Sequence, residues 1–230
     1  MKKFEEFADK IGVKFNNIDF LQQAFTHRSY INENPGVKTG HNERLEFLGD
    51  AVLELVVTDF LYEKYPDKPE GELTAYRAAL VNTISISRAA TELGANEYLL
   101  LSKGEAKDTG KARQYILANT FEAIIGAVYV DQGYDAAQKF IENSLFHYID
   151  EVIENRLWQD AKSYFQEQAQ EHVSITPAYQ VLEEVGPDHD KQFTVGIFLK
   201  DEQIAKGQGR SKQDAEQAAA KAGLEAKGWE

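Results

Sequence analysis

Three acidic residues, Glu43, Glu46 and Asp50, stand at a spacing that could support metal chemistry. On a helix, positions i, i+3 and i+7 lie within about 60° of one another, so the three carboxylates would share one face. Like charges this close repel one another, and a divalent cation between them offsets the repulsion. The competing interpretation is an ordinary solvated acidic face, which is what most charged helix faces are.

A second segment carries the same kind of pattern further along the chain. Asn119 and Glu122 are three residues apart and would share a helix face, with the small residue Gly126 one turn beyond Glu122. Carboxylates from two helices can converge on a hard cation, because such cations prefer oxygen ligands. The two segments together favour a divalent-metal site over a solvated surface.

Both segments must be helical for this chemistry, and the apolar residues around them have helical spacing. From the start to about residue 150, apolar residues recur at intervals of three and four, and Gly- and Pro-containing breakers separate the segments. This pattern predicts an all-α bundle over residues 1–149. The residues expected to face its core are Leu45, Leu48, Val52 and Leu55 in the first segment and Phe121, Ile124, Ile125 and Val128 in the second.

The texture of the sequence changes near residue 150. The charged stretch that follows predicts a linker over 150–159. Beyond it, a helix is expected over 160–171, strands over 178–182, 193–199 and 202–208, and a closing Ala-rich helix over 212–226. We therefore expect a multidomain protein in which an all-α domain precedes an α+β domain of order α-β-β-β-α over 160–228.

Composition excludes some classes of protein. The 230 residues contain no cysteine, so disulfide scaffolds and cysteine-ligated zinc sites are excluded. A formal charge of −13 argues, taken alone, against a nucleic-acid partner, since phosphate backbones attract basic proteins. The sequence has no signal peptide and no apolar run long enough to span a membrane, so we expect a cytoplasmic protein with no membrane partner.

The segment from His41 to Leu53, which reads HNERLEFLGDAVL, resembles the signature of the ribonuclease III family of double-stranded-RNA endonucleases. The resemblance covers nearly the whole chain, and the C-terminal α-β-β-β-α unit is similar to a double-stranded-RNA-binding domain. Further matching segments are Phe25–Tyr30, Glu70–Thr74, Arg77–Asn82, Ile116–Ala123 and Gly207–Lys212.

The resemblance implies which residues form the nuclease site. Glu46, Asp50 and Glu122 match the carboxylates that hold the catalytic metal, with Asp50 and Glu122 in catalytic roles. Asn119 stands at a metal-site position where the family usually has Asp, and the amide keeps one oxygen that can ligate. Two further acids, Glu43 and Glu70, match residues that line the cleft or bind a second metal. The implied cofactor is Mg²⁺, with Mn²⁺ as a substitute.

The same resemblance implies an activity and a partner. Metal-activated water would cleave double-stranded RNA to 5′-phosphate and 3′-hydroxyl ends, in processing of rRNA precursors and other structured transcripts. Phe47 matches a residue that packs into the partner subunit of a homodimer. Asn119 keeps open a non-catalytic double-stranded-RNA-binding dimer. A helical metal-binding protein without RNA would leave the C-terminal unit unexplained.

The family also implies an RNA-binding surface in the C-terminal unit. Its matching residues are Gln166, Glu167, Pro187, His189, Arg210, Ser211 and Lys212. Gln213 replaces a lysine common in the family, so we expect RNA affinity to be modest and sensitive to salt. His27 and His41 have no second histidine at metal-binding spacing, and we expect both to make structural hydrogen bonds.

Overall fold

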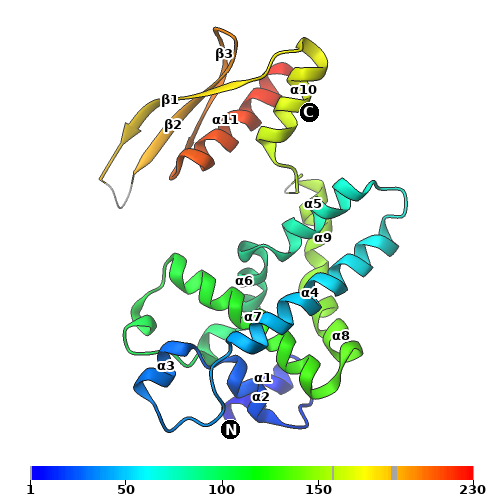
Figure 1. The fold of residues 1–230 in the computed structure, drawn as a ribbon, viewed down its shortest axis with the longest axis vertical. Coiled ribbons are helices and arrows are strands. Elements are labelled where there is room, and N and C mark those ends of the chain that lie inside the picture. Colours follow the sequence, from blue (N-terminus) through cyan, green and yellow to red (C-terminus); the bar gives the residue numbers. More distant parts are fainter. Residues whose placement is uncertain (1, 157, 188–190, 230) are drawn as a thin grey trace. The chain divides into compact units, whose positions relative to one another are not determined.

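The computed structural model describes residues 2–156, 158–187 and 191–229 and divides the chain into two compact units, Met1–Trp158 and Gln159–Glu230. Figure 1 shows a helical first unit and a second unit in which helices cover a small sheet. This confirms the expected all-α domain followed by an α+β domain. Within the described residues, none of the helices has the length and apolar character needed to cross a membrane.

The first unit consists of helices of very different lengths. In chain order they are α1 (Lys2–Lys10), α2 (Ile18–Ala24), α3 (Arg28–Glu33), α4 (Glu43–Lys64), α5 (Glu70–Val81), α6 (Thr83–Glu92), α7 (Lys111–Gln132), α8 (Tyr134–Leu145) and α9 (Ile149–Glu154), with short 3₁₀ turns η1 (Ala95–Tyr98), η2 (Glu105–Lys107) and η3 (Phe146–Tyr148). Helices α4 and α7 have 22 residues each and pack against one another through the centre of the unit (Figure 1).

Helix α4 has three faces where the sequence predicted two. Val52, Leu53 and Val56 are buried as a core face should be, but Leu55 is 57% exposed, so its predicted place in the core is wrong. Because α4 is also buried through Leu53 and Leu61, the centre of its buried face is rotated well away from Leu55. The acidic residues therefore border the buried face, and a separate exposed apolar face remains.

The segment expected as a linker begins with a helix. Residues 149–154 form α9, and its side chains Ile149 and Val152 are buried in the core of the first unit. These two apolar residues are three positions apart, which suffices to fix one face of a short helix on the core. Residues 150–154 are thus part of the first unit's packing.

The second unit consists of α10 (Ala161–Val173), β1 (Ala178–Val185), β2 (Gln192–Leu199), β3 (Glu202–Gly209) and α11 (Lys212–Lys227). The strands form an antiparallel sheet of order β1-β2-β3. Both helices pack on one face of the sheet (Figure 1), where Phe165 of α10 and Ile197 of β2 are fully buried with Ala219 of α11. This small core holds the ends of α10 and α11 in place.

Candidate functional site

The candidate site lies where α4 and α7 cross, with a glycine of each helix against the backbone of the other. A Cβ atom on Gly49 of α4 would overlap the backbone carbonyl of Glu122, and one on Gly126 of α7 would overlap the carbonyl of Leu45. Only glycine permits so close an approach of two helices. Since Glu46 and Asp50 flank Gly49 on α4, the crossing brings the acidic residues of the two predicted segments together.

Electrostatics show that these carboxylates act on one another. Burial, followed by the charges of Asp50 and Glu46, raises the pKa of Glu122 to about 8. Burial, followed by the charges of Glu43 and Asp50, also raises the pKa of Glu46. A raised carboxyl pKa means that the ionised form lacks enough water or positive charge nearby. The crossing therefore concentrates negative charge in a half-buried place.

The donor set fits a hard divalent cation. Within the described residues, Glu46, Asp50 and Glu122 have no ion pair with a basic side chain, so their charge is available to a cation. In the same part of the chain, no group of three or more His, Asp or Glu side chains has the arrangement needed to hold a metal ion, so the side chains at the crossing must turn toward a cation to bind it. Carboxylate oxygens are the ligands that Mg²⁺ prefers. Asn119 is half-buried one turn before Glu122 and can add an amide oxygen.

The other two predicted acids have different surroundings. Glu43 is exposed and lies between two basic side chains, 3.5 Å from Nη1 of Arg28 and 3.7 Å from Nδ1 of His41. Glu70 begins α5, where its Oε1 accepts a hydrogen bond of 2.9 Å from Thr74 Oγ1. The charge of Glu70 does not contribute to the raised pKa of Glu46 or of Glu122.

An exposed apolar stripe runs along α4 beside the acidic residues. Its members are Phe47, Leu55 and Tyr62, which are 81%, 57% and 71% exposed. Sequence reasoning singled out Phe47 and missed the other two. At 100° per residue, their intervals of eight and seven residues keep the three side chains within an arc of about 80°, which is the signal that could have revealed the stripe.

A cavity of about 450 Å³ lies at the far end of this stripe. It is lined by Thr58, Leu61, Tyr62, Lys68, Glu70, Leu73, Thr74 and Arg77. The lining comes from the second half of α4 and from α5 with the turn before it. The cavity thus contains one member of the apolar stripe and one predicted site acid, Glu70.

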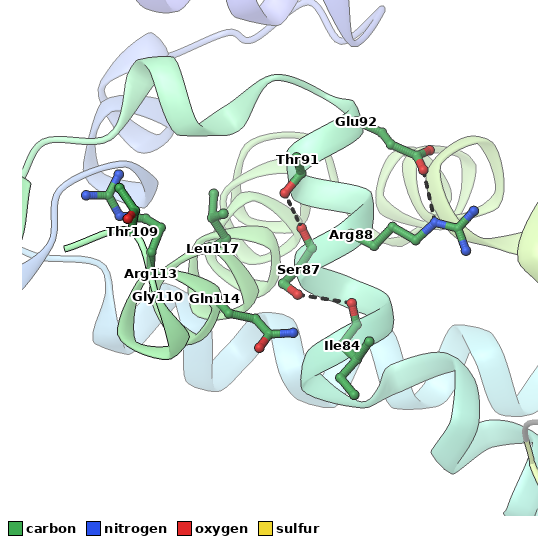
Figure 2. A pocket seen from close by; sticks show the side chains of 10 residues that line it. All are labelled: Ile84, Ser87, Arg88, Thr91, Glu92, Thr109, Gly110, Arg113, Gln114 and Leu117. Atoms are coloured by element: carbon green, nitrogen blue, oxygen red, sulfur yellow. Dashed lines mark hydrogen bonds and ion pairs between the residues drawn. The ribbon is translucent and has the colours of Figure 1, made fainter. Parts of the chain in front are cut away.

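A different cavity, of about 470 Å³, lies between α6 and the first turns of α7 (Figure 2). Its α6 wall includes Arg88, which is paired with Glu92 on the same helix and with Glu151 of α9. Figure 2 also shows Arg113 and Gln114 on the α7 wall. None of the residues predicted from the sequence lines this cavity, so the acidic crossing and the cavity are separate features.

The two histidines near the site behave differently from one another. His27 caps α3, where its Nδ1 accepts from the backbone N–H of Ser29 at 3.3 Å, as expected of a structural histidine. His41 does not meet the same expectation, because its Nδ1 is buried without a hydrogen-bond partner and faces Glu43. The neighbouring Asn42 is buried and donates to the Ala24 carbonyl, which fixes the backbone ahead of α4.

The predicted RNA-binding residues of the second unit are on its surface where the structure describes them. Gln166 and Glu167 are exposed on α10 and line a shallow depression there. Ser211 caps α11 by accepting from the backbone N–H of Asp214 at 3.1 Å, and the exposed Lys212 begins that helix. The remaining positions are Arg210 and Pro187, both exposed, and His189, which lies outside the described residues.

Comparison with known families places both units. A family model described as Ribonuclease-III-like matches residues 17–149, and a model of the double-stranded RNA binding motif matches residues 161–227. These matches define an enzyme that combines a nuclease domain with a double-stranded-RNA-binding domain. The chain belongs to the ribonuclease III family, the endoribonucleases of double-stranded RNA.

Similar proteins extend over almost the whole chain. The chain is 47% identical over 223 residues to Ribonuclease 3 of Geobacillus kaustophilus, covering 97% of this chain and 90% of the relative. It is 46% identical to Ribonuclease 3 of Latilactobacillus sakei, covering 96% and 95%. A solved nuclease domain of ribonuclease III from Campylobacter jejuni is 37% identical with a TM-score of 0.55, covering 61% of this chain and 97% of that one.

Proposed function

We propose that the chain hydrolyses double-stranded RNA at the crossing of α4 and α7, where Glu46, Asp50 and Glu122 hold Mg²⁺, or Mn²⁺ in its place. The proposal rests above all on the carboxylates that the Gly49–Gly126 contact brings together. When bound, the cation supplies a lowered pKa for water and neutralises charge on the scissile phosphate. Asn119 contributes an amide oxygen, and Asp50 and Glu122 are the catalytic carboxylates.

One of these carboxylates is protonated in the metal-free protein. With its pKa at about 8, the carboxyl of Glu122 keeps a proton at neutral pH in the metal-free protein. Positive charge beside a carboxyl lowers its pKa, so Glu122 would lose this proton to water when a cation is bound. The backbone contact between Gly49 and Glu122 holds this carboxyl close to α4 in either protonation state. We expect cleavage to give 5′-phosphate and 3′-hydroxyl ends, on rRNA precursors and other structured transcripts in the cytoplasm.

The two parts of the chain divide the work in this proposal. Residues 1–149 cleave and residues 160–228 grip the duplex, with 150–159 between them. Binding reads the shape of A-form RNA through its 2′-hydroxyls and phosphates. One contact set is Gln166 and Glu167 on α10, and another is Pro187 and His189 before β2. The third contact set is Arg210, Ser211 and Lys212. Its positive charges and the N–H groups at the start of α11 bind phosphate.

We further propose a two-fold homodimer formed through the apolar stripe of α4. Leu55 lies midway between Phe47 and Tyr62, so antiparallel packing about Leu55 places Phe47 against the Tyr62 end of the partner. The cavity at that end is large enough to receive an aromatic ring. The solved Campylobacter jejuni relative is itself described by structural flexibility in a region involved in dimer formation.

The dimer gives Glu70 a role that one chain does not. Glu70 lines the cavity offered to the partner subunit's Phe47, and Phe47 directly follows Glu46 in α4. Packing of the ring therefore carries Glu70 toward the acidic crossing of the other subunit. In this arrangement the dimer has two sites, one for each RNA strand. Each site combines the acidic crossing of one subunit with Glu70 of the other subunit.

The proposed activity is tested with a labelled RNA duplex incubated with Mg²⁺ or with EDTA. Wild-type protein should cleave in Mg²⁺ alone, and Glu122→Gln should not cleave in either condition. Glu63→Gln, which neutralises an exposed acid on the same α4 away from the crossing, should cleave as the wild type does. Cleavage that persists in EDTA or in Glu122→Gln would refute the mechanism. Binding without cleavage by the wild type would instead support the non-catalytic alternative that Asn119 keeps open.

A further inference from the structure

One cation lies beside the acidic crossing. Among the Arg and Lys side chains that the structure describes, Arg28 is the one that pairs with a carboxylate of the group Glu43, Glu46, Asp50 and Glu122. Its Nη1 is 3.5 Å from Oε1 of Glu43, and 69% of its side chain is exposed. That separation is longer than a close hydrogen bond, so the pair is held by charge attraction alone. A guanidinium has five N–H donors, and most of those of Arg28 therefore face water.

The backbone around Arg28 is firmly anchored. On one side, the N–H of His27 donates to the carbonyl of Leu100 at 3.1 Å. On the other side, the hydroxyl of Ser29 accepts from the N–H of Ser102 at 3.1 Å. The first turn of α3 is thereby fixed to the segment ahead of η2. The anchored backbone keeps the base of the Arg28 side chain beside Glu43, while the exposed guanidinium is free to change partner.

Binding of RNA at the acidic crossing requires positive charge beside the carboxylates. RNA brings several phosphates past the crossing, and the carboxylates repel all of them except where a divalent cation intervenes. The planar fork of arginine matches the oxygens of a phosphate and binds it in two parallel hydrogen bonds. Glu43 offers Arg28 only one oxygen at 3.5 Å, so a phosphate is the better partner.

We propose that Arg28 binds a backbone phosphate of the RNA next to the cleavage site, and that Glu43 occupies Arg28 until the phosphate displaces it. Arg28 is then a substrate-positioning residue of the nuclease domain, and Glu43 is its ion-pair partner in the absence of RNA. This inference rests on the proposed endonuclease function, because it assumes that the duplex passes over the acidic crossing. It does not depend on which cation is bound.

The test measures RNA affinity against salt concentration in full-length protein carrying Glu122→Gln, in Mg²⁺, so that the proposed mechanism leaves the duplex intact. The comparison is made in a Glu43→Gln background, which removes the carboxylate that pairs with Arg28. There, adding Arg28→Ala should weaken binding about fivefold at physiological salt, as loss of one charge-assisted contact does. It should also reduce the slope of log affinity against log salt by about one, the change expected for one lost phosphate contact.

Two controls keep the inference falsifiable. Arg44→Ala removes the same charge from an exposed neighbour at the start of α4, and it should leave the slope nearly unchanged. Arg28→Gln keeps a polar, unbranched side chain without the charge, and it should reproduce the result of Arg28→Ala. Agreement between the two variants shows that the loss comes from the missing charge and not from a local disturbance of α3. The inference is overturned if Arg28→Ala has no effect once Glu43 is Gln, since Arg28 then serves only its carboxylate partner. It is equally overturned if Arg44→Ala gives the same loss.

The outcome is separable from that of the proposed function. A wild-type protein that fails to cleave duplex RNA contradicts the proposed function, whatever Arg28 does. A slope that stays the same in Arg28→Ala contradicts the Arg28 contact, while cleavage by the wild type can stand.

Discussion

The sharpest prediction is that Glu122→Gln stabilises the metal-free protein, and that the gain grows with pH. Glu122 ionises in the unfolded chain near its ordinary pKa of 4.5, but in the folded protein near 8. For an acid, a raised folded-state pKa means that the folded state binds the proton more tightly. Stability from this group is therefore complete below about pH 4.5 and is lost as pH rises toward 8.

The size of the effect follows from the same shift. A change from 4.5 to about 8 corresponds at most to about 5 kcal/mol. Glu122 is half-buried, so solvent screens part of this, and we expect about 2 to 3 kcal/mol. Glutamine has nearly the same shape and does not ionise, so the variant escapes the loss. The two proteins should have nearly equal free energies of unfolding near pH 4.5. Near pH 8 the free energy of unfolding of the variant should be higher by this amount.

The assay is urea unfolding in EDTA, followed by tryptophan fluorescence at several pH values. The chain has two tryptophans, and Trp158 packs edge-on against Tyr76, with ring centroids 5.0 Å apart in the first unit. A Trp229→Phe background leaves Trp158 as the reporter of that unit. A pH-independent difference between the two proteins would refute the reasoning, as would a less stable Glu122→Gln at pH 8. Added Mg²⁺ should narrow the gap, because the cation stabilises the wild type more.

Four further substitutions test other parts of the structure. Gly49→Ala should lower the free energy of unfolding by about 3 kcal/mol in a urea titration, since the methyl group overlaps the Glu122 carbonyl. Asn119→Asp should lower the Mg²⁺ concentration for half-maximal cleavage by roughly tenfold through an added carboxylate ligand; equal Mg²⁺ dependence would contradict a ligand role. Phe47→Glu should sediment as a monomer, and an unchanged dimer rejects the stripe as the interface. Gln213→Lys should strengthen binding to duplex RNA and steepen its salt dependence by about one phosphate contact.

The elements of both domains could be predicted because periodicity is local. Alternation in 193–199 predicted the central strand, which the structure extends to Gln192–Leu199. The first strand was predicted too short, ending at Leu182, because β1 is an edge strand whose exposed residues include Glu183 and Glu184. Periodicity also could not show how many neighbours a helix has. Leu55 was therefore assigned to the core although it belongs to the exposed stripe of α4.

The site could be predicted only in part. Spacing placed Glu43, Glu46 and Asp50 on one face of α4, but nothing local says that Glu122 lies beside them. That proximity depends on Gly49 and Gly126, whose contact joins residues distant in the chain. The pairing of Arg28 with Glu43 had no sequence signal for the same reason.

The glycine contact between α4 and α7 also bears on how this protein can change. Where side chains separate two helices, a substitution in the core alters their distance by fractions of an ångström and detunes whatever lies between them. Here backbone atoms are already in direct contact, so a smaller side chain elsewhere in the core cannot bring the two helices closer together. Substitutions at core positions such as Val52 and Ile124 that do not overfill the core should therefore leave the spacing of the carboxylates unchanged. The stability of the domain and the spacing of its acidic residues can evolve as separate traits.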